Sequence, residues 1–465
     1  MLIKRSLQFL PAQLFAPLAQ FASIIAWTYY CSAETIGLIT LFAVFQELAQ
    51  KIVFGWWAHY TIRYYGESEE SWCDSDLFLV LLTAIQIVLS FFTLWFWFGS
   101  EFSWAFYSFV AFYMALRSLN QYFSVMFSIK GKAIGFNICS LSGPCVGLLI
   151  SLILLENFGD DIIYLIVGFI IGECLSIAYF CATSNLVFKM ISKSVIHKAF
   201  SYGVPLLVAG IFSWNALNIS RFVVEWNLGL AAVGEFAVGF GLGQRAANLA
   251  SMLVSPAALP LAMKKMRDEG EKAAMQQLGD NFSLLIAVML PALVGVYMIK
   301  DEFLPLAISE NFQASALLTF PWALLSGGLF AVIYHYCNHY FLVVARTKPL
   351  ILVDLTLAVV VAFSSWWMVG AFGFVGGVIS MVIASGAVML AMLVYLVGFR
   401  GLIFPFKSFF ITGLSVLTMS LGIEASRDLV PSGWLGVISL VLLGSTIYIL
   451  VMYPFYKKGD VLKYA

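Results

Sequence analysis

Four basic side chains lie inside long apolar stretches of this chain, at Lys51, Arg117, Arg221 and Arg245. A charge near the centre of a bilayer costs about 2.5–3.5 kcal/mol on insertion scales, so such residues normally face a protein interior or a water-filled cavity. His335 lies in a further apolar stretch. Because buried cations need negative partners, these residues predict either internal ion pairs or a cavity that binds an anion.

Arg117 and Arg245 are the strongest cavity candidates, because neither has an acidic residue within one helical turn on its own stretch. A planar guanidinium can donate two parallel hydrogen bonds to phosphate oxygens, so these residues suit a phosphate-bearing headgroup. Glu47, Glu173 and Glu235 are acidic residues within apolar stretches. We consider them as ion-coupling acids or as ion-pair partners of the basic residues.

Three of the candidates have a second interpretation. Lys51 follows Glu47 by four residues, which is the favoured order for an ion pair along a helix. Arg221 precedes Glu225 by the same spacing near the end of its stretch, where a local ion pair or a side chain that reaches the interface is expected. His335 is interpreted either as a proton-relay group or as a neutral, packed ring.

The sequence contains no recognisable catalytic or metal-binding motif. Its four histidines have no cysteine or carboxylate at metal-ligand spacing, and no glycine-rich phosphate loop follows a strand. Its seven cysteines include no CxxC pair, and most lie in apolar runs, where cysteine packs as a small hydrophobic residue. We therefore expect no catalytic residue, no metal, no cofactor and no enzymatic activity. The zero formal net charge gives no reason to expect a nucleic-acid partner.

Apolar stretches dominate the chain, with 62% hydrophobic and 11% charged residues, against roughly 25% charged residues in soluble proteins. Fourteen stretches approach the length that spans a bilayer, at roughly 6–30, 37–58, 77–98, 104–127, 133–155, 162–184, 200–225, 232–255, 281–299, 316–343, 350–369, 374–398, 406–424 and 434–453. They do not alternate polar and apolar residues as barrel strands do. The fold class is therefore predicted as all-α integral membrane, with about 14 transmembrane helices.

The basic residues also predict an orientation. With the N-terminus on the cytoplasmic side, 19 of the 25 Lys and Arg residues fall in cytoplasmic segments and only Lys300 and Arg427 on the opposite side. This asymmetry follows the positive-inside rule. Both termini are therefore expected to be cytoplasmic. Residues 260–280, which are charged and rich in Met and Ala, are expected to form a short surface helix on that side.

Two stretches suggest an internal repeat. Residues 117–123 and 335–341 share a basic residue, an asparagine and a Tyr-Phe pair at an offset of 218, and a weaker similarity relates the second and eighth stretches. Each match pairs a stretch with the one six places later, which predicts two parallel six-helix halves. We expect an N-terminal lobe at 1–184, a C-terminal lobe at 199–398 and two additional transmembrane helices at 406–453.

Local patterns resemble a known family. Residues 32–37, Pro205, Ser220-Arg221 and residues 229–237 resemble motifs of the polysaccharide-transport branch of the multidrug/oligosaccharidyl-lipid/polysaccharide exporter superfamily. The O-antigen (Wzx-type) flippases are its familiar members. Many relatives carry Asp before this arginine, whereas this chain has Ser220, so the resemblance gives position 220 no ion-coupling role.

The resemblance implies a flippase that moves a polyprenyl-diphosphate-linked oligosaccharide across the bacterial inner membrane by alternating access. Such transport serves lipopolysaccharide, O-antigen or exopolysaccharide synthesis, with a polysaccharide polymerase and a chain-length regulator as possible partners beside membrane lipids. Two alternatives stay open. A multidrug/cation antiporter of the same superfamily would need an acidic cavity, and a membrane-embedded glycan polymerase or ligase would need a larger external loop than residues 300–315.

Overall fold

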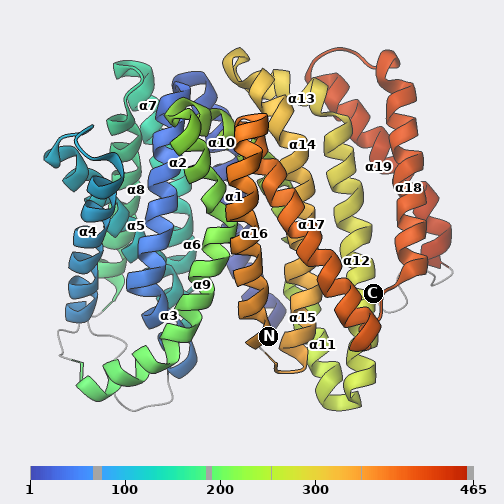
Figure 1. Cartoon of the computed structure of the whole chain (residues 1–465), viewed down its shortest axis with the longest axis horizontal. Helices are drawn as coiled ribbons and strands as arrows, with labels where there is room; N and C mark the ends of the chain where they lie inside the picture. The colour runs from blue at the N-terminus through green and yellow to red at the C-terminus, as the bar shows by residue number, and fades with distance from the viewer. Residues whose placement is uncertain (1, 66–75, 185–190, 253, 347, 458–465) are drawn as a thin grey trace. The chain divides into compact units, whose positions relative to one another are not determined.

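The computed structural model describes residues 2–65, 76–184, 191–252, 254–346 and 348–457 (Figure 1). Throughout these ranges the regular elements are helices, which confirms the all-α prediction. Their bounds are α1 Leu2–Tyr30, α2 Ala33–Gln50, η1 Lys51–Gly55, α3 Trp56–Tyr64, α4 Asp76–Phe98, α5 Trp104–Ile129, α6 Ala133–Leu141, η3 Ser142–Gly147, α7 Leu148–Phe158, α8 Ile162–Thr183, α9 Lys193–Leu228, α10 Leu230–Met252, α11 Ser255–Glu269, α12 Glu271–Met298, α13 Lys300–Ala307, α14 Glu310–Val332, η4 Ile333–Cys337, α15 Asn338–Val343, α16 Lys348–Phe372, α17 Phe374–Phe399, α18 Phe406–Ser426, η5 Arg427–Leu429 and α19 Trp434–Lys457.

Eleven helical segments within the described residues are long and apolar enough to cross a membrane. Three other long helices, α1, α5 and α10, have 29, 26 and 23 residues and coincide with expected spans without being among those eleven. The count of about 14 therefore stays a prediction. The chain is a multi-pass membrane protein.

The expected surface helix at 260–280 was wrong in its bounds. Helix α11 begins at Ser255 and ends at Glu269, and residues 271–280 already belong to the long helix α12. Gly270 separates the two helices at a φ of 87°, a left-handed conformation that glycine adopts without steric cost. The charged residues of 271–280 are therefore the first turns of a spanning helix.

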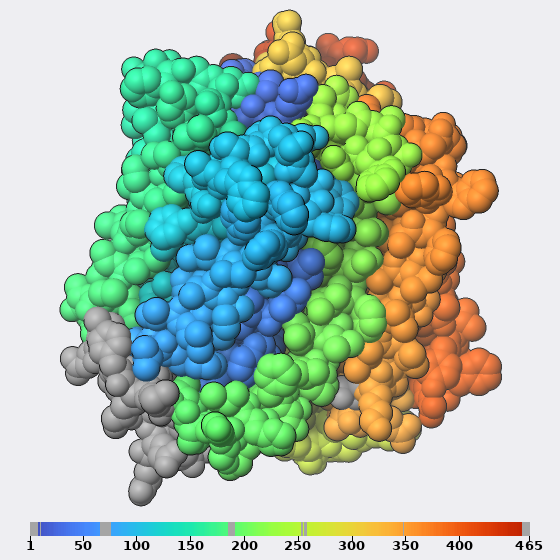
Figure 2. All heavy atoms as spheres, turned by 60° about the vertical axis from the view of Figure 1, so that its left-hand side comes forward, coloured from blue at the N-terminus to red at the C-terminus, as the bar shows by residue number. Residues whose placement is uncertain are grey.

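The outer surface of α4 shows why these helices suit lipid. In the space-filling view α4, in light blue, lies at the surface of the N-terminal part of the chain (Figure 2). Its buried residues recur every three or four positions, whereas Val80, Phe92 and Phe96 on the other side are more than half exposed. Apolar side chains on both sides of a helix are expected where one side packs on protein and the other on acyl chains.

The chain forms two compact units, which comprise residues 1–218 with 229–234, and residues 219–228 with 235–465. The predicted lobes at 1–184 and 199–398, with extra helices at 406–453, stay a prediction. Within the first unit α2 packs against the start of α10, because a β-carbon at Gly37 would overlap the Leu230 carbonyl and one at Gly234 would overlap the Ala33 carbonyl. Small residues allow this close backbone approach between membrane helices.

Aromatic residues form much of the core of each unit. In the first, Phe123 and Phe180 stack with ring centroids 3.6 Å apart inside a cluster that includes the buried Trp57. In the second, Phe282 of α12 stacks on Tyr336 at 3.9 Å, and the Tyr336 hydroxyl donates to the Ile403 carbonyl at 2.8 Å. These contacts fix the helices that hold the candidate residues.

Candidate functional site

Arg117 lies half-buried on α5 in a polar cluster inside the first unit. Its Nη1 donates a hydrogen bond of 3.0 Å to the hydroxyl of Tyr113, which is buried one turn earlier on the same helix. Glu173 and Glu47 lie within electrostatic range of the guanidinium. Among the described residues neither forms a direct ion pair with Arg117, so most of its hydrogen-bond donors are not committed to a carboxylate.

Glu173 is the buried acid of this cluster, on α8. Its Oε2 accepts a hydrogen bond from Nδ2 of Asn120, which also donates to the Cys139 carbonyl at 2.9 Å. Gly143, in the π-helical segment η3, leaves room for the carboxylate, because a β-carbon there would lie 2.8 Å from Glu173 Oε1. Asn120 therefore stabilises an acid that is close enough to Arg117 to influence its charge.

Lys51 is the first residue of the π-helix η1. The ion pair with Glu47, one of the two interpretations of Lys51, is not formed among the described residues, and Glu47 is exposed whereas Lys51 is half-buried. The Lys51 backbone N–H donates to the Glu47 carbonyl as in an α-helix, so the pair is absent although the two residues keep helical spacing. The Lys51 side chain instead reaches toward Gly210 of α9, since a β-carbon at Gly210 would lie 3.9 Å from Lys51 Cδ.

Arg221 lies in the second unit, stacked on aromatic rings. Its guanidinium carbon is 4.9 Å from the ring centroid of Phe240 and 5.9 Å from that of Phe236, both on α10. This is cation–π geometry, which holds the charge against a ring face. The preceding residue, Ser220, is fully buried and its hydroxyl contacts the Met381 sulfur at 3.5 Å.

Arg245 and Glu235 lie on α10 in the same unit, and both are half-buried. The neighbour of Arg245, Gln244, donates from Nε2 to the Ser326 hydroxyl of α14 at 2.7 Å, which fixes this turn of α10 on α14. Arg245 and Arg117 belong to different units.

His335 lies in another π-helix, η4, and its ring centroid is 6.1 Å from that of the buried His339. His339 Nδ1 and Asn338 Oδ1 have no hydrogen-bond partner among the described residues. Close by, the Tyr334 hydroxyl lies 3.4 Å from Oδ1 of Asp354, a buried acid on α16. Sequence reasoning missed Asp354, although an acid inside the apolar stretch 350–369 was a usable signal.

No group of three or more His, Cys, Asp or Glu side chains is arranged to hold a metal ion in the part of the chain that the structure describes. Two of the candidate residues, Lys51 and His335, lie in π-helical segments. Such segments occur frequently at functional sites.

An apolar groove lies between α12, α18 and α19 of the second unit. It has a volume of about 420 Å³, and its lining includes Pro291, Gly295, Met419 and Leu440. Tyr448 closes one part of it, because its hydroxyl donates to the Ala287 carbonyl at 2.7 Å. Helices α18 and α19 are the two that lie beyond the predicted repeat.

Solved structures share this fold. Lipid II flippase MurJ in an inward closed conformation matches with a TM-score of 0.76 at 15% identity, covering 97% of this chain and 99% of that one. An inward-facing multidrug resistance MATE family transporter of the MOP superfamily matches with a TM-score of 0.59 at 12% identity over 83% and 96%. The MATE multidrug transporter DinF-BH matches with a TM-score of 0.52 at 15% identity over 88% and 96%.

The sequence itself gives a family assignment. No curated protein sequence matches the chain. A family model described as "Polysaccharide biosynthesis protein" matches residues 32–317, which is more than half of the 465 residues. The chain therefore belongs to the polysaccharide biosynthesis protein family, in agreement with the superfamily branch that its local motifs resemble, and has the fold of the MurJ and MATE transporters.

Proposed function

We propose that this protein is a flippase for a polyprenyl-diphosphate-linked oligosaccharide, and not an enzyme. The observation that carries the proposal is Arg117, whose guanidinium on α5 donates a hydrogen bond to a tyrosine and forms no ion pair among the described residues. Such a guanidinium at this depth is costly unless it has an anionic ligand. A diphosphate provides several oxygens with the geometry that the guanidinium fork prefers.

The second unit offers cationic groups of its own for the headgroup. Arg245 supplies a second guanidinium, and Arg221 is held on aromatic rings. Lys51 and His335 lie in π-helical segments, one in each unit, and add cationic or proton-exchanging groups. A different role, ion coupling, is proposed for three acids, which would take up and release an ion or a proton as transport proceeds. These are Glu47, Glu173 and Glu235.

The lipid tail needs a different surface from the headgroup. The apolar groove of α12, α18 and α19 is suited to an isoprenoid chain, because its lining is almost entirely hydrocarbon. Polyprenyl chains are apolar and thin, so a groove on one unit can hold part of a chain while the remainder stays in lipid. The two extra helices would then serve the lipid carrier and not the sugar.

Alternating access supplies the transport step in this proposal. Carrying about two negative charges outward gains roughly 4–5 kcal/mol per 100 mV of membrane potential, inside negative. We place the protein in the bacterial inner membrane with both termini cytoplasmic, on the strength of the basic-residue asymmetry. A polysaccharide polymerase and a chain-length regulator are proposed partners, in line with family membership.

A multidrug/cation antiporter is the second candidate, favoured by the shared fold with MATE transporters. Such a protein would attract cations to buried acids, of which Glu173 and Asp354 are the examples among the described residues. Glu173, however, accepts a hydrogen bond from Asn120 and lies within electrostatic range of Arg117, so it does not present an isolated negative charge.

The test measures flipping by the purified protein in proteoliposomes that contain a fluorescent polyprenyl-diphosphate disaccharide. Arg117→Ala and Arg245→Ala are each expected to slow flipping at least about tenfold, the equivalent of one charge-assisted hydrogen bond. Arg117→Lys should retain an intermediate rate. Arg267→Ala, at an exposed position of α11, is the matched control and should flip normally.

The two candidates give opposite results in this assay. A headgroup site requires that the arginine variants lose flipping while their folded yield stays normal. Full flipping by both arginine variants would remove them as headgroup ligands. Uptake of a fluorescent cationic drug by the wild-type protein, with no movement of the lipid-linked disaccharide, would establish the antiporter instead.

A further inference from the structure

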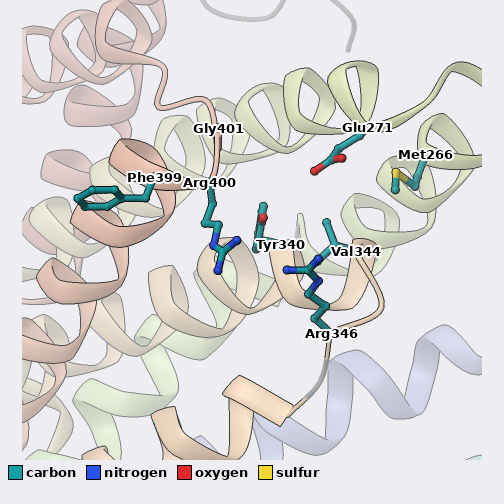
Figure 3. Close-up of a pocket in the computed structure, with 8 residues that line it drawn as sticks. All are labelled: Met266, Glu271, Tyr340, Val344, Arg346, Phe399, Arg400 and Gly401. Atoms are coloured by element: carbon teal, nitrogen blue, oxygen red, sulfur yellow. The ribbon is translucent and has the colours of Figure 1, made fainter.

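A polar pocket of about 380 Å³ lies in the second unit where several spanning helices end. Arg346 and Arg400 extend into it from different segments, with Tyr340 between them and Glu271 above (Figure 3). Helices α15 and α17 end here and α12 begins, so the pocket is at the helix ends and not at mid-membrane. None of the residues considered for the headgroup site lines it.

Arg346 is placed by a tight ending of helix α15. Its backbone N–H donates to the Phe341 carbonyl at 2.9 Å, and the Ala345 N–H donates to the Leu342 carbonyl at 3.2 Å. This pattern is a Schellman motif, which needs a left-handed residue. Here that residue is Ala345, at a φ of 54°, where an L-residue other than glycine is strained. A strained backbone at a non-glycine residue is an observation that points to a functional constraint.

Arg400 is placed by its own helix. Its Nε donates to the hydroxyl of Tyr395 at 2.7 Å, and its guanidinium carbon lies 5.1 Å from the centroid of the same ring. The hydrogen bond raises the pKa of Arg400 above its already high usual value, so the group keeps its charge. Neither Nη group has a hydrogen-bond partner in the part of the chain that the structure describes, so both can bind a ligand. Gly401, at a φ of 72°, turns the chain away directly afterwards.

The charges around the pocket are not neutralised by one another. Glu271, Arg346 and Arg400 all lie within electrostatic range of the Tyr340 hydroxyl. No ion pair joins Glu271 to either arginine among the residues that the structure describes. Two guanidinium groups and one carboxylate give the pocket a formal charge of +1, with donors and an acceptor facing a common space (Figure 3).

We propose that this pocket binds the headgroup of an anionic glycerophospholipid, with phosphatidylglycerol as the type. The phosphodiester would lie between Arg346 and Arg400, and a headgroup hydroxyl would donate to Glu271. One phosphodiester charge matches the formal charge of the pocket. Basic pockets between membrane helices are known to hold lipid headgroups. Phe399, 78% exposed at the rim, offers an apolar surface for the start of an acyl chain.

The residues around the pocket indicate that it lies at the membrane interface. Its helix ends and short connections carry an excess of basic residues, among them Lys264, Lys265, Lys348 and Lys407. Such an excess is expected on the cytoplasmic side, where it attracts anionic lipid. A bound phospholipid would tie together the ends of α12, α15 and α17. This site does not depend on the proposed flippase function, because its ligand is a resident lipid and not the cargo.

Native mass spectrometry of the purified full-length protein tests the proposal. The protein in neutral detergent is titrated with phosphatidylglycerol, and separately with phosphatidylethanolamine, phosphatidylcholine, polyprenyl diphosphate and inorganic phosphate. We expect one phosphatidylglycerol bound at the lowest concentration. Arg346→Ala and Arg400→Ala should each weaken that binding about tenfold, and Arg267→Ala, outside the pocket, should not change it. Should an alanine variant lose its monodisperse folded form, the corresponding Arg→Gln variant replaces it.

Three outcomes of this experiment would contradict the proposal. Equal binding of phosphatidylglycerol by the wild-type protein and by the double variant Arg346→Gln with Arg400→Gln would overturn the proposal. Tighter binding of phosphatidylcholine than of phosphatidylglycerol would also overturn it, since charge would then play no part. Displacement of phosphatidylglycerol by polyprenyl diphosphate but not by other phospholipids would make the pocket an entry site for cargo, against the proposal.

Discussion

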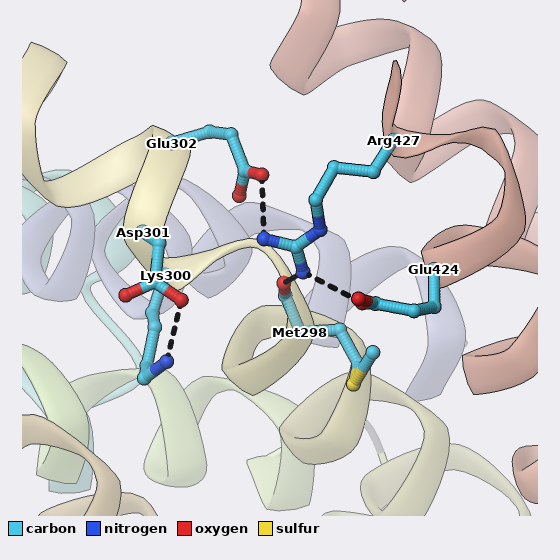
Figure 4. A network of polar contacts seen from close by, with 6 residues as sticks. All are labelled: Met298, Lys300, Asp301, Glu302, Glu424 and Arg427. Carbon is cyan, nitrogen blue, oxygen red and sulfur yellow. Dashed lines mark hydrogen bonds and ion pairs between the residues drawn. The ribbon is translucent and has the colours of Figure 1, made fainter. Parts of the chain in front are cut away.

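Replacing Arg427 by alanine is expected to loosen the attachment of α18 to α12 and α13. The Arg427 Nη1 donates to Glu302 Oε1 at 2.8 Å, and its Nη2 donates to the Met298 carbonyl at 2.8 Å (Figure 4). The Nη2 also pairs with Glu424 Oε2 at 3.1 Å, on the helix that Arg427 follows. One side chain therefore joins three acceptors, two of which belong to other helices.

The size of the effect follows from the exposure of the partners. The Glu424 side chain is 61% exposed, so its ion pair contributes only about 0.5 kcal/mol. The Arg427 and Glu302 side chains are each 28% exposed, and their pair should contribute about 1 kcal/mol because solvent still screens it. The Met298 carbonyl adds about 1 kcal/mol, the value of an ordinary hydrogen bond, because solvent reaches the guanidinium. Arg427→Ala should thus lower the free energy of unfolding by about 2–3 kcal/mol.

Denaturation by SDS in mixed micelles, followed by circular dichroism, measures this free energy. A double-mutant cycle with Glu302→Ala should give a coupling energy of about 1 kcal/mol, since the pair is direct. Asp301→Ala, which removes the neighbouring pair with Lys300 instead, is the control and should cost less than about 0.5 kcal/mol. A loss below about 0.5 kcal/mol for Arg427→Ala, or additive effects in the cycle, would refute the reasoning.

Further predictions concern packing, a thiol and orientation. Gly37→Val should abolish monodisperse folded protein on size exclusion because its side chain would meet backbone, whereas Gly413→Val, with nothing within 4 Å of the β-carbon position, should behave as wild type. Burial, assisted by a nearby carboxylate, raises the pKa of Cys31 to about 12. The thiolate fraction at pH 8 should therefore be about a thousandfold lower than for a free thiol. Maleimide labelling of Cys31, measured by peptide mass spectrometry, should be slower by a similar factor. With the proposed orientation, an impermeant thiol reagent on intact cells should label Glu156→Cys and not Lys130→Cys; the reverse pattern would invert the topology.

The helical fold was predictable because the lipid around the chain allows few other structures. Lipid offers no hydrogen bonds to the backbone, so a continuous apolar run of sufficient length must be a helix. Helix α4 illustrates this, since the predicted stretch 77–98 is almost the observed Asp76–Phe98. Shorter elements were less predictable. Helix α13, Lys300–Ala307, lies in a segment that was expected to be only an external loop, because eight residues give too little periodicity to recognise.

The candidate residues were identified from the sequence, but their partners were not. Arg117 and Tyr113 are four residues apart, so helical spacing could have predicted their contact. Only acidic partners were considered for Arg117 from the sequence, and this tyrosine was therefore missed. The contact between Asn120 and Glu173 joins α5 to α8 and depends on tertiary packing. Lys51 shows the opposite failure, because it has the helical spacing of an ion pair with Glu47, yet Glu47 is exposed and the Lys51 side chain lies near Gly210 of α9.

The repeated motif shows how two similar halves can differ in chemistry. Asn120 supports the carboxylate of Glu173 in the first unit, whereas Asn338 follows the π-helix η4 and its Oδ1 has no partner among the described residues. The basic position of the motif is Arg117 in one unit and His335 in the other. An arginine keeps its charge at any physiological pH, and a histidine can lose it. The corresponding position of the motif therefore offers a permanent charge in the first unit and a group that can gain or lose a proton in the second.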